Sequence, residues 1–539
     1  MVSSSRFLRV TALVIFAGAP ALAGSVSENR SVASLRTPAS PREANNLFHA
    51  LQAATQQGRK TAARKKAVRR VAKAPAAPSW TSPHGAASLS ADLGALVDRS
   101  VRSGKFGAMV VSLTRGDTVF SRNAGEMMNP ASTMKLFSTA VALDRFGPEH
   151  TFSTDVLRDG PISPDGTVQG NLYLRADGDP SMSARFFRDP NLPMATLAQA
   201  VAAAGVKKFT GDLIYDASAF DDRKIPEGWK TSYLGASYAA RVSALSLNEN
   251  LVWVVVSPAG TVAQVTLEPV TTTIPMRNNV RLVGGKGGRI VARRNNDGGI
   301  DVSGSIGSLS GPLRYSLVVE DPALFTAGAL QAALQNVGVT GSGNVRAART
   351  PANVTKVASL GSPPLSEIVS EMNRESINIV AELLFRDASR AAAPDGVAGA
   401  EVGLANLRDF LSKKVGADPQ AIRVFDGSGL STLDYLTPRT MVQLLSYAHK
   451  GPWSSAFHGS LPVAGESELL RKRMRGTPAE GNLHAKTGTT NTTVGLGGYV
   501  TAKDGEIMAF SFIYNGNDRW PAKAAMDAMG ATLANFVRE

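Results

Sequence analysis

The change in predicted secondary structure along this chain constrains its fold more than any single motif does. Helix-like and strand-like patterns fill residues 88–146, and helical patterns return at about residue 365, whereas short strand-like runs separated by turn residues fill 151–350. One hydrophobic core stops growing at roughly 250 to 300 residues, and this chain has 539. We therefore predict an α/β (α+β) protein in which a β-rich domain is inserted into a discontinuous first domain.

The domain boundaries follow from these changes between helix-like and strand-like sequence patterns. We place the discontinuous domain at residues 88–155 and 353–539, and the inserted β-rich domain at residues 156–352. A smaller module at about 261–312 is predicted to be nested in the insert, because that stretch is rich in Gly and in short strand-like runs. The first domain is thus expected to be assembled from both ends of the chain.

The N-terminus has the layout of a secretory signal peptide. Arg6 and Arg9 precede an apolar run from Val10 to Ala23, which closes with small residues. We predict that residues 1–23 are removed on export to a periplasm, with membrane or wall association as a further expectation. The rival interpretation is a retained membrane anchor, but this run of 14 residues is shorter than the roughly 20 that a spanning helix needs.

Positive charge is concentrated behind this segment. Residues 1–80 hold 13 Lys and Arg against Glu28 and Glu43, which is most of the formal net charge of +14. We predict a basic, Ala- and Pro-rich linker at residues 24–87, largely disordered. It is either only a solvated spacer or a weak electrostatic contact to anionic membrane or wall polymer. Because the excess sits in one block, nucleic acid is not the predicted partner.

The chain contains no Cys. This excludes disulfides, a lipidated cysteine, thiol catalysis and Cys-ligated metal. Its six His residues are too scattered in sequence to indicate a ligand cluster. We therefore predict neither a metal nor an organic cofactor.

The central motif is Ser132-Thr133-Met134-Lys135 at the start of a helix predicted over residues 134–146. Residues three apart on a helix lie on one side, so the hydroxyl of Ser132 and the amine of Lys135 are expected to meet. A Ser hydroxyl needs a base to act as a nucleophile, and a Lys serves if burial lowers its pKa. Alone, the pair is equally consistent with two polar residues on an amphipathic helix.

A second motif, Lys486-Thr487-Gly488-Thr489, precedes a hairpin predicted by Lys503-Asp504-Gly505. A strand with a cation, a hydroxyl and a Gly suits an extended peptide that ends in a carboxylate and docks as an extra strand. The plain alternative is an exposed strand end.

A third motif, Ser-x-Asn, occurs five times in the chain. We favour Ser376-Ile377-Asn378, because it lies in the helical stretch from Leu365 to Arg386 where the first domain resumes. The other choice considered, Ser246-Leu247-Asn248, lies in the β-rich insert and is interpreted as a turn before the strand-like run at 251–256.

These motifs, in this order, resemble those of the class-C type-4 penicillin-binding proteins, the D-alanyl-D-alanine carboxypeptidase/endopeptidases. The resemblance runs from about residue 88 to the end and includes NPASTMKLFSTAVAL, EMNRESINIVAELLFR, FDGSGLS and GNLHAKTGTT. It implies a penicillin-binding-protein/β-lactamase-like transpeptidase domain, with helices flanking an antiparallel sheet and β-rich inserted domains.

The resemblance also implies roles for the motif residues. Ser132 is expected to attack the D-alanyl carbonyl, with Lys135 as its base and Asn378 as an orienting residue. Ser376 and Lys486 are expected to return the proton to the leaving amine. Lys486, Thr487 and Thr489 are expected to hold the substrate carboxylate, and Thr487, Gly488 and Thr489 are expected to form the substrate-binding strand.

The expected activity is therefore hydrolysis of peptidoglycan stem peptides and cross-links, with inhibition by acylating β-lactams. Two other functions remain open at this stage. A β-lactamase uses the same constellation with fast deacylation, and a catalytically dead protein would only bind the wall. The sequence does not indicate an oligomeric state.

Overall fold

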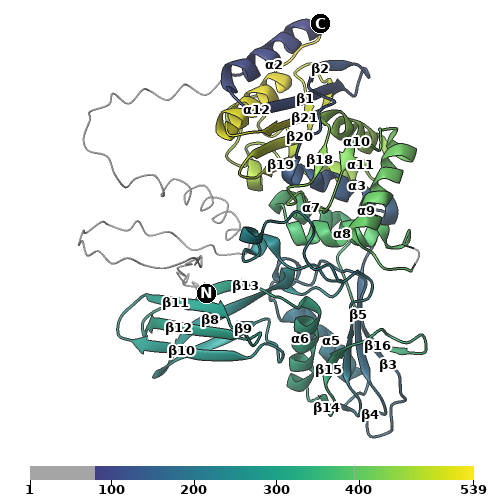
Figure 1. Ribbon diagram of the computed structural model, residues 1–539, viewed down its shortest axis with the longest axis vertical. Helices are drawn as coiled ribbons and strands as arrows, with labels where there is room; N and C mark the ends of the chain where they lie inside the picture. Colours follow the sequence, from purple (N-terminus) through teal and green to yellow (C-terminus); the bar gives the residue numbers. More distant parts are fainter. Residues whose placement is uncertain (1–78, 394) are drawn as a thin grey trace, which may run out of the picture.

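The computed structural model describes residues 79–539 apart from residue 394. The predicted signal peptide, and the predicted linker up to residue 78, lie outside the described residues. The chain forms a sheet with covering helices at one end, a helical layer in the middle and β-rich parts at the other end (Figure 1). None of the helices in the described part is long and apolar enough to cross a membrane.

A five-stranded antiparallel sheet joins the two ends of the chain. Its strand order is β19-β20-β21-β1-β2, so the last strands of the sequence lie beside the first. Helices α2 (Ala86–Ser100) and α12 (Arg519–Ala534) pack together over it. The strands are β1 Lys105–Ser112, β2 Thr118–Arg122, β19 His484–Thr489, β20 Thr493–Thr501 and β21 Ile507–Asn515.

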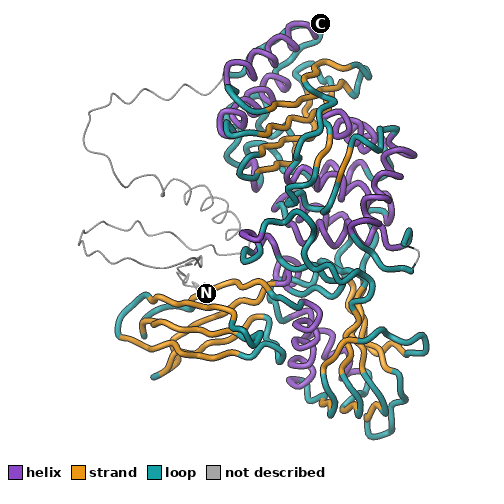
Figure 2. The backbone as a smooth tube through the Cα atoms, viewed as in Figure 1, coloured by secondary structure: helices purple, strands orange, loops and turns teal. Residues whose placement is uncertain are grey.

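The helical layer lies between this sheet and the insert (Figure 2). Its centre is α3 (Lys135–Phe146), whose first nine residues are all buried. The predicted helical stretch from Leu365 to Arg386 is two helices, because Ser376 adopts a left-handed conformation with φ of 59° and Ile377 is extended. The surrounding helices are α7 Leu365–Glu375, α8 Asn378–Arg390, α9 Ala400–Phe410, α10 Pro438–Lys450 and α11 Ser454–Gly459.

The inserted part is built on a second five-stranded sheet, of order β15-β7-β5-β3-β16. Its helices α5 (Leu192–Ala203) and α6 (Pro322–Asn336) pack against each other, so the insert is less purely β than its sequence indicates. The strands are β3 Ser153–Arg158, β5 Leu172–Ala176, β7 Leu213–Asp216, β15 Val345–Ala347 and β16 Thr355–Gly361. A smaller sheet of order β14-β6-β4 joins Thr340–Gly341, Lys208–Phe209 and Thr167–Val168.

The entry and exit strands of the insert pair with each other. Ser153 of β3 lies opposite Gly361 of β16, so both strands belong to the insert's sheet. The predicted boundary at 155/156 therefore falls within β3. The predicted boundary at 352/353 assigns β16 to the first domain, although β16 belongs to the sheet of the insert. Because β3 and β16 lie about 200 positions apart in the sequence, local sequence patterns do not reveal that they pair.

Within the insert, two three-stranded sheets form a nested module. One has the order β13-β8-β9, the other β10-β12-β11, and β12 contacts both β8 and β9. The expected range of 261–312 leaves out β8 and β13. The strands are β8 Leu251–Ala259, β9 Val262–Glu268, β10 Met276–Val283, β11 Gly288–Arg294, β12 Ile300–Gly307 and β13 Leu313–Val318.

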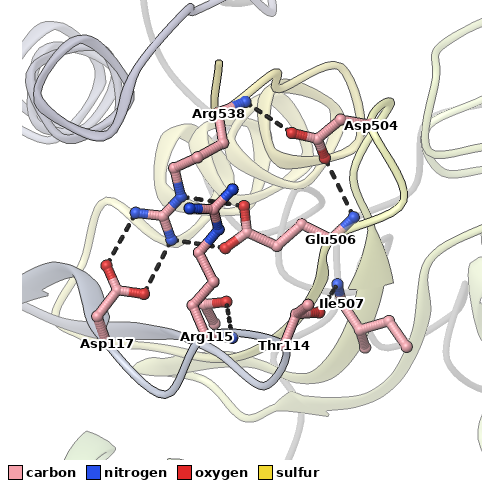
Figure 3. Close-up of polar contacts among 8 residues, drawn as sticks. Thr114, Arg115, Asp117, Asp504, Glu506, Ile507 and Arg538 are labelled. Atoms are coloured by element: carbon pink, nitrogen blue, oxygen red, sulfur yellow. Dashed lines mark hydrogen bonds and ion pairs between the residues drawn. The ribbon is translucent and has the colours of Figure 1, made fainter.

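The penultimate residue ties the chain end to the first sheet (Figure 3). The Arg538 guanidinium donates to both carboxylate oxygens of Asp117, at 2.8 and 2.9 Å, and to those of Glu506, at 3.1 and 2.5 Å. Its backbone N–H donates to Asp504 at 2.7 Å. Since Asp117 lies in the turn after β1 and Glu506 in the turn before β21, one side chain fastens two turns.

We predict that Arg538→Ala lowers the free energy of unfolding by about 3 kcal/mol, because it leaves the Glu506 carboxylate buried without a cation. The Glu506 side chain is only 4% exposed. Urea unfolding of the purified protein measures the change. Arg115→Ala, which removes an exposed side chain nearby, is expected to stay within about 0.5 kcal/mol of the parent. Equal effects of the two substitutions would contradict the assignment.

Candidate active site

Ser132 lies in a tight turn immediately before α3. The predicted helix begins one residue later than expected, at Lys135, and residues Ala131–Met134 form a 3₁₀ turn. In a 3₁₀ turn, side chains three apart are eclipsed, so the turn aligns Ser132 with Lys135 more closely than an α-helix does. Ala131 has a φ of 48°, a strained conformation of the kind that clusters at functional sites.

The amine of Lys135 is surrounded by three oxygen atoms. Its Nζ lies 3.1 Å from Ser132 Oγ and 2.7 Å from both Asn378 Oδ1 and the Ser428 carbonyl oxygen. A neutral amine has two hydrogens and one lone pair. The two carbonyl oxygens accept only, so they take the two hydrogens and leave the lone pair for the Ser132 hydroxyl. This is the geometry of a base beside a nucleophile.

Burial favours the neutral form of this amine. The side chain of Lys135 is 0% exposed, and burial lowers its pKa to about 7, although the nearby carboxyl groups of Asp426, Glu382 and Asp434 oppose the shift. Near neutral pH the amine can therefore accept a proton.

Ser376 and Asn378 flank the break between α7 and α8. The amine of Lys486 donates to Ser376 Oγ at 2.8 Å and to the Thr487 carbonyl at 2.9 Å. Asn378 accepts from Lys135, while its own amide donates to the carbonyl of Tyr238 in the insert at 2.8 Å. The break in the helix thus presents one residue to each of the two lysines.

The other Ser-x-Asn considered lies elsewhere in the structure. Ser246 is buried in the insert, and its hydroxyl donates to Asn250 Oδ1 at 2.9 Å. Asn250 in turn donates to the carbonyl of Arg241 at 2.7 Å. These contacts hold the turn that leads into β8.

Lys486 lies on β19, the edge strand of the first sheet. Its amine is fully buried, and burial together with the nearby charge of Lys135 lowers its pKa well below the ordinary value. Thr487 is buried and Thr489 is exposed at the strand end. An edge strand leaves backbone groups free on one side. On the side of β19 away from β20, the Ala485 N–H already donates to the Pro462 carbonyl at 3.0 Å and Val463 bridges His484, so the end of the strand at Thr487–Thr489 is the part that can accept an extended peptide.

Gly488 has a structural role that the sequence did not indicate. A Cβ atom at this position would lie 2.7 Å from the carbonyl oxygen of Pro130 and 3.1 Å from the backbone nitrogen of Ser132. We expected this Gly to be part of the substrate-binding strand, but the space beside its Cα is filled by the backbone of the Ser132 turn. Gly488 therefore sets how closely β19 approaches that turn.

Sequence reasoning gave no role to Asp426, which organises the turn beside Lys135. Its carboxylate accepts from the backbone N–H groups of Ser428, Gly429 and Ser431 at 3.0, 2.6 and 2.7 Å. It also accepts from the indole N–H of Trp229, in the insert, at 2.6 Å. These bonds fix the Ser428 carbonyl that receives a hydrogen from Lys135. The sequence signal, Asp-Gly-Ser-Gly, indicates only a turn.

Two further carboxyl groups lie buried near Lys135. Burial raises the pKa of Glu382 to about 8, and burial with the neighbouring Asp426 raises the pKa of Asp434 well above its ordinary value. Glu382 is therefore mainly protonated at neutral pH, and the pKa of Asp434 is shifted in the same direction. Asp426 accepts from four N–H donors, and among these carboxyl groups it has the largest opposing effect on the lowered pKa of Lys135.

Three of the six histidines gather beside β19, contrary to the scatter expected from sequence. The rings of His458 and His484 are 4.5 Å apart, and Tyr499 lies 5.1 Å from His458 and 6.0 Å from His449. Burial lowers the pKa of His458 to about 4, which keeps it neutral. No group of three potential metal ligands among residues 79–539, with 394 set aside, is arranged to hold an ion.

Comparison with known proteins places this site in a family. The sequence signature of the D-Ala-D-Ala carboxypeptidase 3 (S13) family matches residues 89–536. The chain belongs to this family. The predicted resemblance is thereby confirmed, and the S13 assignment makes the protein a hydrolase of the D-Ala-D-Ala carboxypeptidase class.

Two similar carboxypeptidases align with most of the chain. The D-alanyl-D-alanine carboxypeptidase of Actinomadura sp. (strain R39) is 33% identical over 485 residues, which span 86% of this chain and 88% of that protein. The D-alanyl-D-alanine carboxypeptidase DacB of Haemophilus influenzae is 24% identical over 424 residues, spanning 76% and 85%.

A solved structure supports the fold class. The crystal structure of penicillin binding protein 4 (dacB) from Haemophilus influenzae aligns with a TM-score of 0.66 at 23% identity, and covers 80% of this chain and 97% of that one. The same protein complexed with a β-lactam aligns with a TM-score of 0.62 at 22% identity. The predicted fold class, helices with an antiparallel sheet and inserted domains, is confirmed.

We predict that Gly488→Ala lowers the free energy of unfolding by about 1–3 kcal/mol through overpacking and reduces D-alanine release at least tenfold. The added methyl pushes β19 away from the Ser132 turn. Gly497→Ala, on the neighbouring strand β20, is the matched control, because a Cβ there meets nothing closer than 3.6 Å. Thermal unfolding and release of D-alanine from a soluble peptide measure both effects. Full activity of Gly488→Ala would contradict the packing argument.

Proposed function

We propose that this S13 carboxypeptidase forms an acyl-enzyme at Ser132, and that it both releases D-alanine from stem peptides and cuts D-alanyl cross-links. One observation carries the proposal. The buried Nζ of Lys135 lies 2.7 Å from two fixed carbonyl oxygens and 3.1 Å from Ser132 Oγ. In its neutral form the amine gives its two hydrogens to the carbonyls and has its lone pair left for the Ser132 hydroxyl. A base so placed activates a serine without an imidazole.

The first step is attack by Ser132 Oγ on the D-alanyl carbonyl carbon. The hydroxyl proton passes to Lys135 Nζ, and a C–O bond forms as the carbonyl becomes an oxyanion. The backbone N–H groups of Ser132 and Thr489 are proposed to hold that oxyanion. Such preorganised donors stabilise the developing charge, and each is worth about 3 kcal/mol in comparable sites.

The second step is departure of the amine. As the C–N bond breaks, the leaving nitrogen takes a proton from the Ser376 hydroxyl, which is replenished from Lys486, 2.8 Å away. Lys135 still holds the proton from Ser132, and it passes that proton through solvent to the now neutral Lys486, so both lysines return to their starting states. Water then attacks the acyl carbonyl while the neutral Lys135 amine takes its proton, and this proton returns to Ser132 Oγ as the acyl C–O bond breaks. Asn378 holds Lys135 by the bond at 2.7 Å throughout.

The substrate carboxylate is proposed to bind Lys486, Thr487 and Thr489, with the peptide lying along the free edge of β19. A carboxylate beside Lys486 favours the charged amine, which reverses the effect of burial on its pKa. In a cross-link the leaving amine belongs to a second peptide rather than to free D-alanine, but the bond broken is the same. The open strand edge therefore supports both reactions.

The surroundings of the enzyme also remain proposals. We propose export by residues 1–23 to a periplasm, where wall peptides and β-lactams reach Ser132, and a weak electrostatic contact of the basic linker with membrane or wall polymer. Cleavage of the N-terminal segment, read by mass from secreted protein, tests the first part.

We predict that Ser132→Ala abolishes both release of D-alanine and covalent labelling by a fluorescent penicillin, because within residues 79–539, with 394 set aside, no other hydroxyl hydrogen-bonds to Lys135 Nζ. Electrophoresis with in-gel fluorescence reads the labelling, and thermal unfolding checks that the variant is folded. Labelling of a folded Ser132→Ala variant would remove Ser132 from the proposed role. Rapid turnover of a chromogenic cephalosporin by the parent would favour a β-lactamase instead.

We predict that the rate of acylation by penicillin falls about tenfold for each pH unit below 7. The pKa of Lys135 is about 7, so below this pH the amine carries a proton and cannot accept another. Above it, the base is free and the rate reaches a plateau. Stopped-flow measurement of acylation between pH 5 and 9 gives the profile. A flat profile down to pH 5 would contradict the role of Lys135.

Asp426→Asn provides a control for this profile. The charge of Asp426 raises the pKa of Lys135, so its removal is expected to move the midpoint to lower pH. The plateau is also expected to fall, since an amide cannot replace both carboxylate oxygens in the turn. A lower plateau with an unmoved midpoint would mean that Asp426 acts only through the turn.

A further inference from the structure

The nested module of the insert presents one face of a sheet to solvent. Strands β10, β12 and β11 lie side by side, with β12 in the middle. Alternate residues point to opposite faces. The inner face carries buried Ile290, Val302 and Ile306 and lies toward β8 and β9, whereas the residues between them face outward.

The register aligns cations across the outer face. Arg281 of β10, Ser305 of β12 and Arg289 of β11 form one row. Arg277, Asp301 and Arg293 form a second row, four positions along the strands. The row between them includes Ser303. Two lines of arginines thus flank a central strand whose outward side chains are Asp301, Ser303 and Ser305.

Most of these arginines have no acidic partner. Arg277 pairs with Asp297 at 3.0 Å and lies 4.0 Å from Asp301. Across the described part of the chain, no ion pair forms at Arg281, Arg289 or Arg293, and all three are exposed. Three guanidinium groups without acidic partners give this exposed face an excess of positive charge, which favours an anionic ligand.

The spacing defines the ligand that would fit. Four residues along a strand span about 13 Å, and two strand spacings span about 10 Å. An Arg guanidinium offers a planar fork that matches a carboxylate. The face therefore suits a polymer with carboxylates spaced about 10 Å apart, and the serine hydroxyls between the lines can hydrogen-bond to its neutral groups.

We propose that this arginine face, defined by Arg281, Arg289, Arg293, Ser303 and Ser305, binds the stem-peptide carboxylates of insoluble peptidoglycan at a point remote from Ser132. The proposal rests on the proposed function, because it assigns the face to the same polymer that the active site cuts. The module projects from the insert, at the far end of the molecule from the sheet that carries β19 (Figure 1). A second contact of this kind raises the local concentration of substrate by avidity.

The test compares two charge reversals in the full chain. Arg281→Glu/Arg289→Glu alters the face, and Lys207→Glu/Lys208→Glu makes the same change of charge at an exposed site elsewhere in the insert. Both are combined with Ser132→Ala for cosedimentation with purified insoluble peptidoglycan at low salt. We expect the first to lower the affinity at least tenfold and the second to change it less than twofold.

Further measurements identify the ligand. With Ser132 intact, both double variants are expected to release D-alanine from a soluble pentapeptide within twofold of the parent. Peptidoglycan whose carboxyls have been converted to methylamides is expected to lose the difference between the variants. Equal cosedimentation of the two variants, or a difference that survives amidation, would overturn the proposal. So would a loss of binding seen only with vesicles of anionic phospholipid.

These results separate the two proposals. If the parent fails to release D-alanine from the soluble pentapeptide, the proposed function fails regardless of the binding data. If it releases D-alanine while both variants bind the insoluble polymer equally, only the arginine face is wrong.

Discussion

One buried amine sets the requirements that the rest of the site meets. Lys135 can act as a base only while its amine is neutral and shielded from water. A buried amine must still donate both of its hydrogens to hydrogen-bond acceptors. Asn378 and the Ser428 carbonyl take them. These acceptors come from segments 243 and 293 positions away, so the helical layer must bring three distant parts of the chain to one nitrogen atom.

The insert takes part in this arrangement although it begins and ends far along the chain. Because β3 and β16 pair side by side, it leaves and rejoins the helical layer at one place. It then returns two groups to the site: the Tyr238 carbonyl holds the Asn378 amide, and the Trp229 indole holds Asp426. The first bond fixes Asn378, which accepts from Lys135, and the second fixes the turn that carries the Ser428 carbonyl, the other acceptor of Lys135. The insert therefore holds the partners of the base and makes no hydrogen bond to the Lys135 amine itself.

Local patterns predicted the parts of the site that are themselves local. The three-residue spacing of Ser132 and Lys135 survives the change from an α-helix to a 3₁₀ turn, and the strand carrying Lys486 was recognisable from its neighbours. The break at Ser376 was not, because a left-handed residue between two apolar helices leaves the helical periodicity nearly intact. The role of Asp426 and the pairing of β3 with β16 depend on partners far away in sequence, which no periodicity records.

The two buried lysines impose a final condition on the proposed mechanism. The charge of Lys135 lowers the pKa of Lys486, beyond the effect of burial, so the empty site disfavours two ammonium groups at once. A bound carboxylate favours the charged form of Lys486, and a charged Lys486 in turn makes protonation of Lys135 less favourable. Binding a peptide that ends in a carboxylate therefore prepares both groups together: an acid for the leaving amine and a free base for Ser132. A peptide whose terminus is an amide lacks this effect, so the electrostatics of the site select for the chemistry of a D-alanyl terminus before any bond is broken.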